Sequence, residues 1–463
     1  MAGVYGAIEK QMSTMQNRPQ LTKMENALRG FLKTCRFEQP QLGEFPPANN
    51  YFVEAESQLL ELQYDSRQLQ IVLRLLERYF GDTLDEKIGR QILKEIAHDW
   101  IDQKCEVANQ EHVAQAWQKL ENELSSKIVT CKWYIPVVGL KFTSPTPLEL
   151  GCCQLWNNAD DSAFRAVIKS FIAKYTPSYE AEIEKMANAP SYLTTSLTMH
   201  NGRAHVTART LGEEALDILR LFRGCYYLDV HNRAMPRQMG LYGSLVVHSH
   251  RPVFSVLENH NIDETWPGWS INVKNFEPFI VDDRALSAIK TYGLDLVNTC
   301  FAQPTPGQAS SLQGRLRRAA RWFSKATTAS SIADSFLMLA IAIESILSEG
   351  RTTKETYAER IAGLVTPKDD FGIYPPGLVA RQLAGTLKQQ NKESRFATIQ
   401  QRVVELFEIR NRIAHGNLED DDVNPLDLID FETIARATIL SFVLGGWSSL
   451  ADFKHWLIAN KPT

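Results

Sequence analysis

The sequence predicts a multidomain protein in which an all-α helical bundle at the C-terminus follows an α+β region. Three observations support this fold class. Apolar residues recur at helical spacing over residues 66–127. Over 128–302, helical spacing and strand-like alternation both occur, and after 311 only helical spacing occurs. Residues 303–311, rich in Gln, Pro, Gly and Ser, form the clearest linker. The expected parts are 1–127, 128–302 and 311–463.

The composition is that of an ordinary globular protein. The 463 residues, 44% of them hydrophobic and 22% charged, suffice for two or three domains. No apolar run approaches the ~20 residues needed to cross a bilayer. The N-terminus lacks the basic and apolar regions of a signal peptide, and seven irregularly spaced cysteines fit a reducing compartment. We therefore expect a cytoplasmic location and no membrane partner.

Charge and motifs exclude several functional classes. The net charge is −4, and residues 311–463 hold 19 Lys/Arg against 18 Asp/Glu, so any RNA contact needs local clusters of positive charge. The chain has no Gly-x4-Gly-Lys-Ser/Thr loop, no Gly-x-Gly-x-x-Gly turn after a strand and no Gly-x-Ser-x-Gly elbow. ATP hydrolysis and dinucleotide chemistry are therefore disfavoured.

The first 302 residues divide into a mostly helical part and a mixed part. The first part has a strand within 51–64 and helices at 66–80, 84–103 and 110–127. In the second part, Pro136 is expected to separate two strands, and Asn201-Gly202 to form a hairpin turn. The strands are expected at 128–135, 137–142, 148–156, 192–199, 203–208, 241–250 and 270–273, and the helices at 161–175, 212–222 and 282–300.

The C-terminal part shows helical patterns only. The expected helices are 312–326, 331–348, 353–366, 378–390, 393–415, 426–443 and 449–459. In the fifth of these, one position on the apolar stripe holds Arg410. A guanidinium there needs an anionic or hydrogen-bonding partner, because an unpaired buried charge costs several kcal/mol, roughly. Alternatively, the Arg410 stem packs at the core edge and its head reaches water.

The same helix ends on a histidine. His415 lies in the expected last turn, Gly416 supplies a C-terminal stop, and Asn411 shares the face of His415 at a spacing of four residues. Arg410 and His415 would be ~140° apart on an ideal helix. Two copies of the helix could therefore line one cleft, with Val404 and Ile409 in the contact.

Arg410-Asn411-x3-His415 resembles the Arg-x4-6-His motif of HEPN domains. The segments Leu312–Ala326 and Asp334–Leu347, which contains Glu344, resemble the first helices of Apea-like HEPN proteins. The resemblance covers about a third of the chain. It implies a homodimeric, metal-independent endoribonuclease that acts in anti-phage, abortive-infection defence, with the middle region as sensor of an unknown phage-derived or regulatory trigger. It also implies an RNA substrate such as tRNA, and no cofactor.

The residue types suit RNA cleavage by attack of a 2′-OH on the adjacent phosphorus. This reaction leaves a 2′,3′-cyclic phosphate and a 5′-OH. His415 would shuttle the proton, because imidazole titrates near neutrality. Arg410 would stabilise the charge that develops on phosphorus, and Asn411 would orient His415 or the phosphate. The alternative is a non-catalytic HEPN module for dimerisation or nucleotide binding, in which Arg410 is a structural cation paired with Glu344.

Further candidates carry two readings each. Arg412 either contacts RNA or pairs with Glu408, and Glu344 either fixes Arg410 or marks the solvent edge of its helix. A basic cluster beside Trp322 is either a phosphate-contacting face or a solvated one. Its members are Arg315, Arg317, Arg318 and Arg321.

No metal site is expected. The adjacent Cys152-Cys153 lack a second cysteine pair. The pairs His200/His205 and His248/His250 each lack a third ligand nearby in sequence. The acidic run 419–422 reads as a solvated loop that precedes the helix start at Asn424-Pro425.

Overall fold

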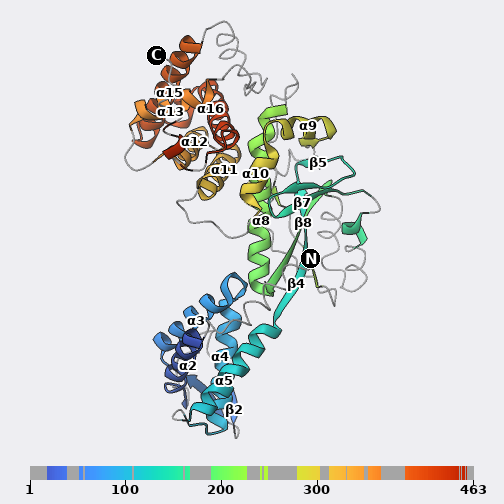
Figure 1. Ribbon diagram of the computed structural model, residues 1–463, viewed down its shortest axis with the longest axis vertical. Coiled ribbons are helices and arrows are strands. Elements are labelled where there is room, and N and C mark those ends of the chain that lie inside the picture. The colour runs from blue at the N-terminus through green and yellow to red at the C-terminus, as the bar shows by residue number, and fades with distance from the viewer. Residues whose placement is uncertain are drawn as a thin grey trace. The chain divides into compact units, whose positions relative to one another are not determined.

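A computed structural model gives the arrangement of the chain (Figure 1). It describes residues 18–38, 52–55, 58–106, 109–159, 162–166, 189–226, 240–241, 245–248, 279–302, 312–329, 331–348, 353–366, 392–447, 449, 451–453 and 455. The chain divides into two compact units, Met1–Cys131 with Ser196–Thr207, and Lys132–Thr195 with Ala208–Thr463. The expected linker, 303–311, is outside the described residues.

The first unit is a helical bundle with a small sheet. Its helices are α2 (Arg18–Leu32), α3 (Ser66–Phe80), α4 (Glu86–Asp102) and α5 (Gln110–Ser126). Its antiparallel sheet has the order β1-β3-β2, from β1 (Arg36–Glu38), β2 (Phe52–Ala55) and β3 (Gln58–Gln63). Asp65, Asp85 and Asn109 precede α3, α4 and α5, and the side chain of each accepts a backbone N–H of the first turn. These caps explain why the predicted starts of these helices lie within two residues of the observed ones.

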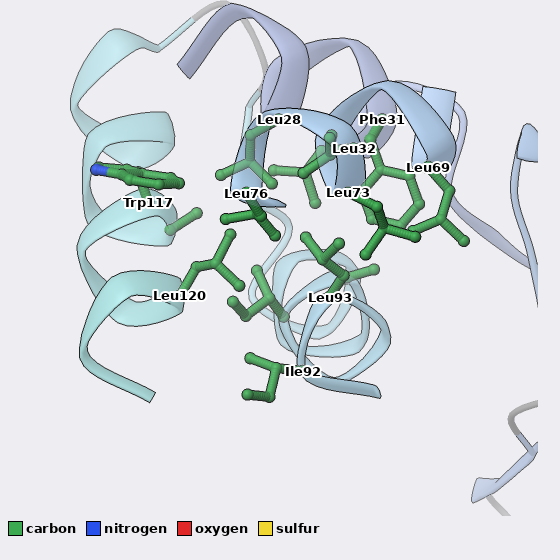
Figure 2. Packing of buried hydrophobic residues seen from close by; sticks show 14 of the residues in the cluster. Leu28, Phe31, Leu32, Leu69, Leu73, Leu76, Ile92, Leu93, Trp117 and Leu120 are labelled. Carbon is green, nitrogen blue, oxygen red and sulfur yellow. The ribbon is translucent and has the colours of Figure 1, made fainter. Parts of the chain in front are cut away.

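The core of this unit comes from one apolar face of each helix (Figure 2). Leu28 on α2, Leu73 on α3, Leu93 on α4 and Leu120 on α5 are all buried to 1% exposure or less. Helix α2 and strand β1 are absent from the sequence prediction, because residues 1–50 have mixed polarity.

The larger sheet has the order β10-β4-β8-β7-β6, and β9 also pairs with β4. Its strands are β4 (Ile128–Val138), β6 (Leu148–Leu150), β7 (Cys153–Asn157), β8 (Ser191–His200), β9 (Gly240–Leu241) and β10 (Leu245–His248). A separate parallel pair joins β5 (Leu140–Phe142) to β11 (Phe279–Val281).

Two predicted strand boundaries are wrong, and glycine explains both. Strand β4 continues through Pro136 and stops before Gly139, whose φ is +70°. The expected strand 148–156 is a hairpin of β6 and β7 that turns at Gly151, with φ +61°. A positive φ is readily adopted by glycine and suits a tight turn.

The expected hairpin at Asn201-Gly202 is also wrong. Helix α8 (Asn201–Tyr226) begins there and includes the expected strand 203–208. A turn dipeptide makes a hairpin only where a strand follows it. Here the following apolar residues are buried at helical spacing, and they are Ala204, Ala208, Leu211 and Ala215.

The expected helix 282–300 is two helices, α9 (Asp283–Thr291) and α10 (Leu294–Phe301), separated at Gly293 with φ +95°. A Cβ at Gly293 would lie 2.9 Å from Leu444 Cδ2, so glycine also permits a close approach to another helix. The expected strand 270–273, the helix 378–390 and most of the helices 161–175 and 449–459 lie outside the described residues.

The C-terminal helices match the expected ones closely. They are α11 (Leu312–Thr328), α12 (Ile332–Leu347), α13 (Lys354–Val365), α15 (Lys392–Ala414) and α16 (Pro425–Leu444). A chain of aromatic contacts joins four of them: Tyr357 to Phe407 at 5.4 Å, Phe407 to Phe431 at 5.6 Å, and Phe431 to Phe336 at 4.9 Å. Packed aromatic pairs contribute about 0.5–1.5 kcal/mol each beyond area burial, so this chain fixes α15 against its neighbours.

No helix in the part of the chain that the structure describes is both long and apolar enough to cross a bilayer.

A buried polar cluster joins α8 to α11. Arg220 Nη1 donates to Ser324 Oγ at 2.7 Å and to Asp217 Oδ1 at 3.2 Å, and all three residues are at most 6% exposed. Burial raises the pKa of Asp217 to about 6, although Arg220 opposes the shift. Glu213, at 3.7 Å from Arg220, and Arg321 also act on this cluster.

We expect this cluster to make stability fall as pH rises through about 6. A carboxyl whose pKa is raised on folding contributes stability that is complete below its unfolded value, near 3.8, and lost as pH rises through about 6. Amide hydrogen exchange in α8 and α11 should therefore speed up between pH 5 and 7, after correction for intrinsic exchange. Asp217→Asn should abolish this dependence, whereas the exposed control Asp421→Asn should keep it. Identical pH profiles for wild type and Asp217→Asn would contradict the expectation.

Candidate active site

Helix α15 carries the candidate motif, and its buried face follows the predicted stripe. Phe396, Ile399, Val403, Leu406, Phe407 and Ile413 are each at most 9% exposed. Ala414, also expected on the stripe, is exposed. Arg402 fixes α15 to α16: its guanidinium donates to Asp430 at 2.9 and 3.0 Å and to Asp427 at 2.5 Å. The sequence analysis did not include Arg402, because no local spacing connects it to acidic residues on another helix.

Arg410 lies at the half-buried edge of the bundle. Its Nη2 donates to Glu344 Oε1 on α12 at 3.1 Å, and both side chains are 27% exposed. Its Nη1 donates to Asn411 Oδ1 at 3.0 Å. Burial raises the pKa of the Glu344 carboxyl, and the Arg410 charge lowers it. The structure thus pairs the two residues, one of the two arrangements considered for Glu344.

His415 is the C-cap residue of α15. The helix ends at Ala414, the Gly416 N–H donates to the Ile413 carbonyl at 2.9 Å, and the Asn417 N–H donates to the Arg412 carbonyl at 2.8 Å. With φ +70° at Gly416, this is a Schellman motif. His415 is exposed, so its imidazole is accessible to a ligand.

Asn411 contacts Arg410 in this structure. Its side-chain oxygen accepts from Arg410, and its backbone carbonyl accepts the His415 N–H at 3.1 Å. Its side chain therefore positions the guanidinium, while orientation of His415 or a phosphate remains a prediction. The His415 N–H still forms the helical i,i−4 hydrogen bond, so the angle of ~140° between Arg410 and His415 remains the expected one.

The expected pair of Arg412 with Glu408 is replaced by another. Glu408 Oε1 accepts from Lys354 Nζ on α13 at 2.5 Å. Arg412 is exposed and forms no ion pair among the described residues, so its surface fits contact with a ligand. A neighbouring helix displaced the local i,i+4 partner because it brings a cation to Glu408.

The basic cluster of α11 does not form one phosphate-contacting face, which corrects that reading. Arg317 is turned inward: its side chain is 10% exposed, Nη2 donates to the Phe301 carbonyl at 3.0 Å and lies 4.0 Å from Glu214. Arg315 donates to carbonyls at the end of α12, and Arg318 is half-buried. Arg321 alone of the four is exposed, and its charge acts on Glu214 and Asp217 of α8.

The acidic run 419–422 is more than a solvated loop. Asp420 Oδ1 accepts from Ser331 Oγ and from the Ala333 N–H, both at 2.7 Å, so it caps the start of α12. These backbone and side-chain hydrogen bonds lower the pKa of Asp420. The sequence predicts the helix start at Ser331, but it does not indicate that Asp420 also caps this helix.

The structure describes only some of the histidines and cysteines that were considered as metal ligands. Among the residues that it describes, no group of three or more His, Cys, Asp or Glu is placed to hold a metal ion. His200 is fully buried, and its ring accepts the Asp85 N–H at 2.9 Å and donates to the Leu124 carbonyl at 2.9 Å. The Cys152 Sγ–H lies 3.3 Å from the carbonyls of Phe301 and Ala302. The side chains of His205, His248 and His250 lie outside the described residues.

No protein-family model, no curated protein and no solved structure matches the chain. The site is therefore interpreted from its own geometry.

Proposed function

We propose that the chain is a metal-independent endoribonuclease of the HEPN type, cleaving RNA by 2′-OH attack to give a 2′,3′-cyclic phosphate. Arg410 and His415 are its catalytic residues, and Asn411 positions the Arg410 guanidinium. The observation that supports the proposal best is that Arg410, whose side chain is 27% exposed, and the exposed His415 both lie in the C-terminal turns of α15. We further propose that the protein acts in defence against phage, with residues 128–302 as a sensor.

The Arg410–Glu344 pair is weak enough for a phosphate to replace it. Partly exposed ion pairs contribute roughly 0–1 kcal/mol, since water screens them. A phosphate group that acquires charge in the transition state can accept two hydrogen bonds from the guanidinium fork, whereas Glu344 accepts one through Oε1. Arg410 can therefore exchange Glu344 for the reacting group at small cost.

His415 suits proton transfer because the helix ends where it does. The C-cap position exposes the imidazole, while the Schellman hydrogen bonds hold its backbone. It could take a proton from the 2′-OH or give one to the 5′ leaving oxygen. In a dimer, the second copy would supply a second imidazole for the other transfer.

The direct test is product chemistry. The full chain and its 311–463 segment are incubated with total RNA and with tRNA, and the fragment ends are analysed. A 2′,3′-cyclic phosphate with a 5′-OH is expected. Fragments with 5′-phosphate and 3′-OH ends would contradict the mechanism, and intact RNA with both proteins would contradict the proposed function.

A substitution of both partners distinguishes this proposal from the alternative module without catalysis. In that alternative, Arg410 and Glu344 only support the fold, so replacing both with apolar residues keeps function. The double variant Glu344→Leu/Arg410→Met should keep its circular dichroism spectrum and lose cleavage. If it cleaves RNA like wild type, Arg410 is structural only.

Cleavage is expected to survive EDTA. Proton transfer by His415 and charge stabilisation by Arg410 together supply what the 2′-OH attack needs, so no metal ion enters the step. The measurement is the cleavage rate constant in EDTA, compared with the rate after addition of Mg²⁺ or Mn²⁺. A rate that EDTA removes and either ion restores would count against the mechanism.

A further inference from the structure

Three arginines from three helices converge on the C-terminal turn of α12. Arg315 of α11 donates through Nη1 to the carbonyls of Ser348, at 2.9 Å, and Ile346, at 3.3 Å. Arg360 of α13 donates through Nη1 to the carbonyl of Leu347. Arg410 of α15 binds Glu344 in the same turn. Residues 344–348 span only about 6 Å of helix axis, so the three guanidinium groups attach to one helix end.

This helix end holds more positive charge than it needs. A helix C-terminus carries about half a negative charge, which one arginine already exceeds. Glu344 balances Arg410, but neither Arg315 nor Arg360 forms an ion pair with a carboxylate among the described residues. Burial lowers the pKa of Arg360, and the nearby charge of Glu359 offsets only part of this decrease. Two guanidinium groups therefore face one half-charge, an excess suited to an anion.

The donors are also prepared for an anion. A guanidinium has five N–H groups in a rigid fork, and the bonds of Arg315 and Arg360 to other described residues use only Nη1. Both side chains are half-buried, which holds them in place without enclosing them. The remaining edge of each fork matches two phosphate oxygens.

We propose that Arg315 and Arg360 bind a backbone phosphate of the RNA substrate at the C-terminal end of α12, next to the phosphate at Arg410. This inference rests on the proposed ribonuclease function. It replaces Arg317, which is turned inward, with Arg360, a residue that the sequence analysis did not consider. The site holds RNA by its backbone, so Arg315 and Arg360 are positioning residues that act on any sequence.

The test is binding, separated from cleavage. The full chain with His415→Ala is titrated with a fluorescent single-stranded RNA whose 2′-OH groups are methylated, over 50–200 mM salt. We expect Arg315→Gln and Arg360→Gln each to weaken binding about tenfold. Each should also lower the slope of log Kd against log salt by about 0.7, the loss of one phosphate contact on a single strand. Glutamine can still donate to the helix carbonyls. Arg78→Gln, which removes one exposed positive charge from α3 of the first unit, is the control and should leave both quantities unchanged.

Lysine variants separate binding from helix capping. Arg315→Lys and Arg360→Lys keep the charge, so they should keep most of the salt slope. The proposal is overturned if the glutamine variants bind with the affinity and slope of the Arg78→Gln control. It is also overturned if the lysine variants bind as weakly as the glutamine ones and both melt early, because the arginines then only cap α12. Arginine-dependent binding by a chain that never cleaves RNA would overturn the nuclease and leave this site in place.

Discussion

Replacing His415 with alanine should lower the rate constant of RNA cleavage by about 10²–10⁴, the usual contribution of a positioned general acid or base. Arg410→Ala should lower it by about 10²–10³, as removal of a charge-stabilising donor does. In the proposed mechanism, His415 transfers a proton and Arg410 stabilises charge. The proton inventory and the pH dependence of the cleavage rate should therefore change in His415→Ala and stay as in the wild type in Arg410→Ala. Single-turnover cleavage of a defined RNA measures both constants.

The fold should survive each of these changes. His415 is exposed and its side chain forms no hydrogen bond or ion pair among the described residues, and Arg410 loses only a partly exposed pair. Gln401→Ala, an exposed change on the same helix, is the control and should cleave at the wild-type rate. If either motif variant retains near-full activity while folded, Arg410 and His415 have been assigned wrongly.

Dilution of the wild-type chain below its dimer dissociation constant should extinguish cleavage. If two α15 helices line one cleft, a single copy supplies only one wall of it and cannot enclose the scissile phosphate. Val404 and Ile409 are half-buried on α15 and offer apolar surface to such a contact. Specific activity should therefore decrease steeply as the protein is diluted, in parallel with the decrease in mass measured by light scattering.

Mixed dimers give the matching control. An Arg410→Ala chain combined with a His415→Ala chain can place one intact guanidinium and one intact imidazole in the shared cleft. Recovery of part of the activity in the mixture, and none in either chain alone, would support a composite site. A chain that is monomeric by light scattering and cleaves at full specific activity would show that one copy suffices.

The sequence predicts helices well where a cap and a periodic face agree. Asp65, Asp85 and Asn109 each begin a helix of the first unit, and the fifth helix of the C-terminal part is within one residue of its expected range. It predicts turns poorly where tertiary contacts decide. Pro136 continues within a strand, and Asn201 begins a helix, because the residues around them pack in that form.

The candidate site was predictable in part. The position of Arg410 on an apolar stripe predicted a partner, and pairing with Arg410 was one of the two roles considered for Glu344, although 66 residues separate them. The hydrogen-bond partners of Arg315, Arg317 and Arg360 were not predictable from the sequence. Each binds a backbone carbonyl at the end of another helix, and such contacts depend on how helices pack and not on which side chains they carry.

Gly416 offers a way to redirect His415 without disturbing the bundle. No atom lies within 4 Å of where its Cβ would be, so a larger residue there meets no clash. The penalty is conformational alone: at φ +70°, an L-residue is strained by about 1–2 kcal/mol. Substitution at Gly416 would therefore change the local backbone torsion and tilt the His415 imidazole. Arg410, Glu344 and the aromatic core would keep their contacts. A series from alanine to valine would convert local strain into a graded change of imidazole orientation.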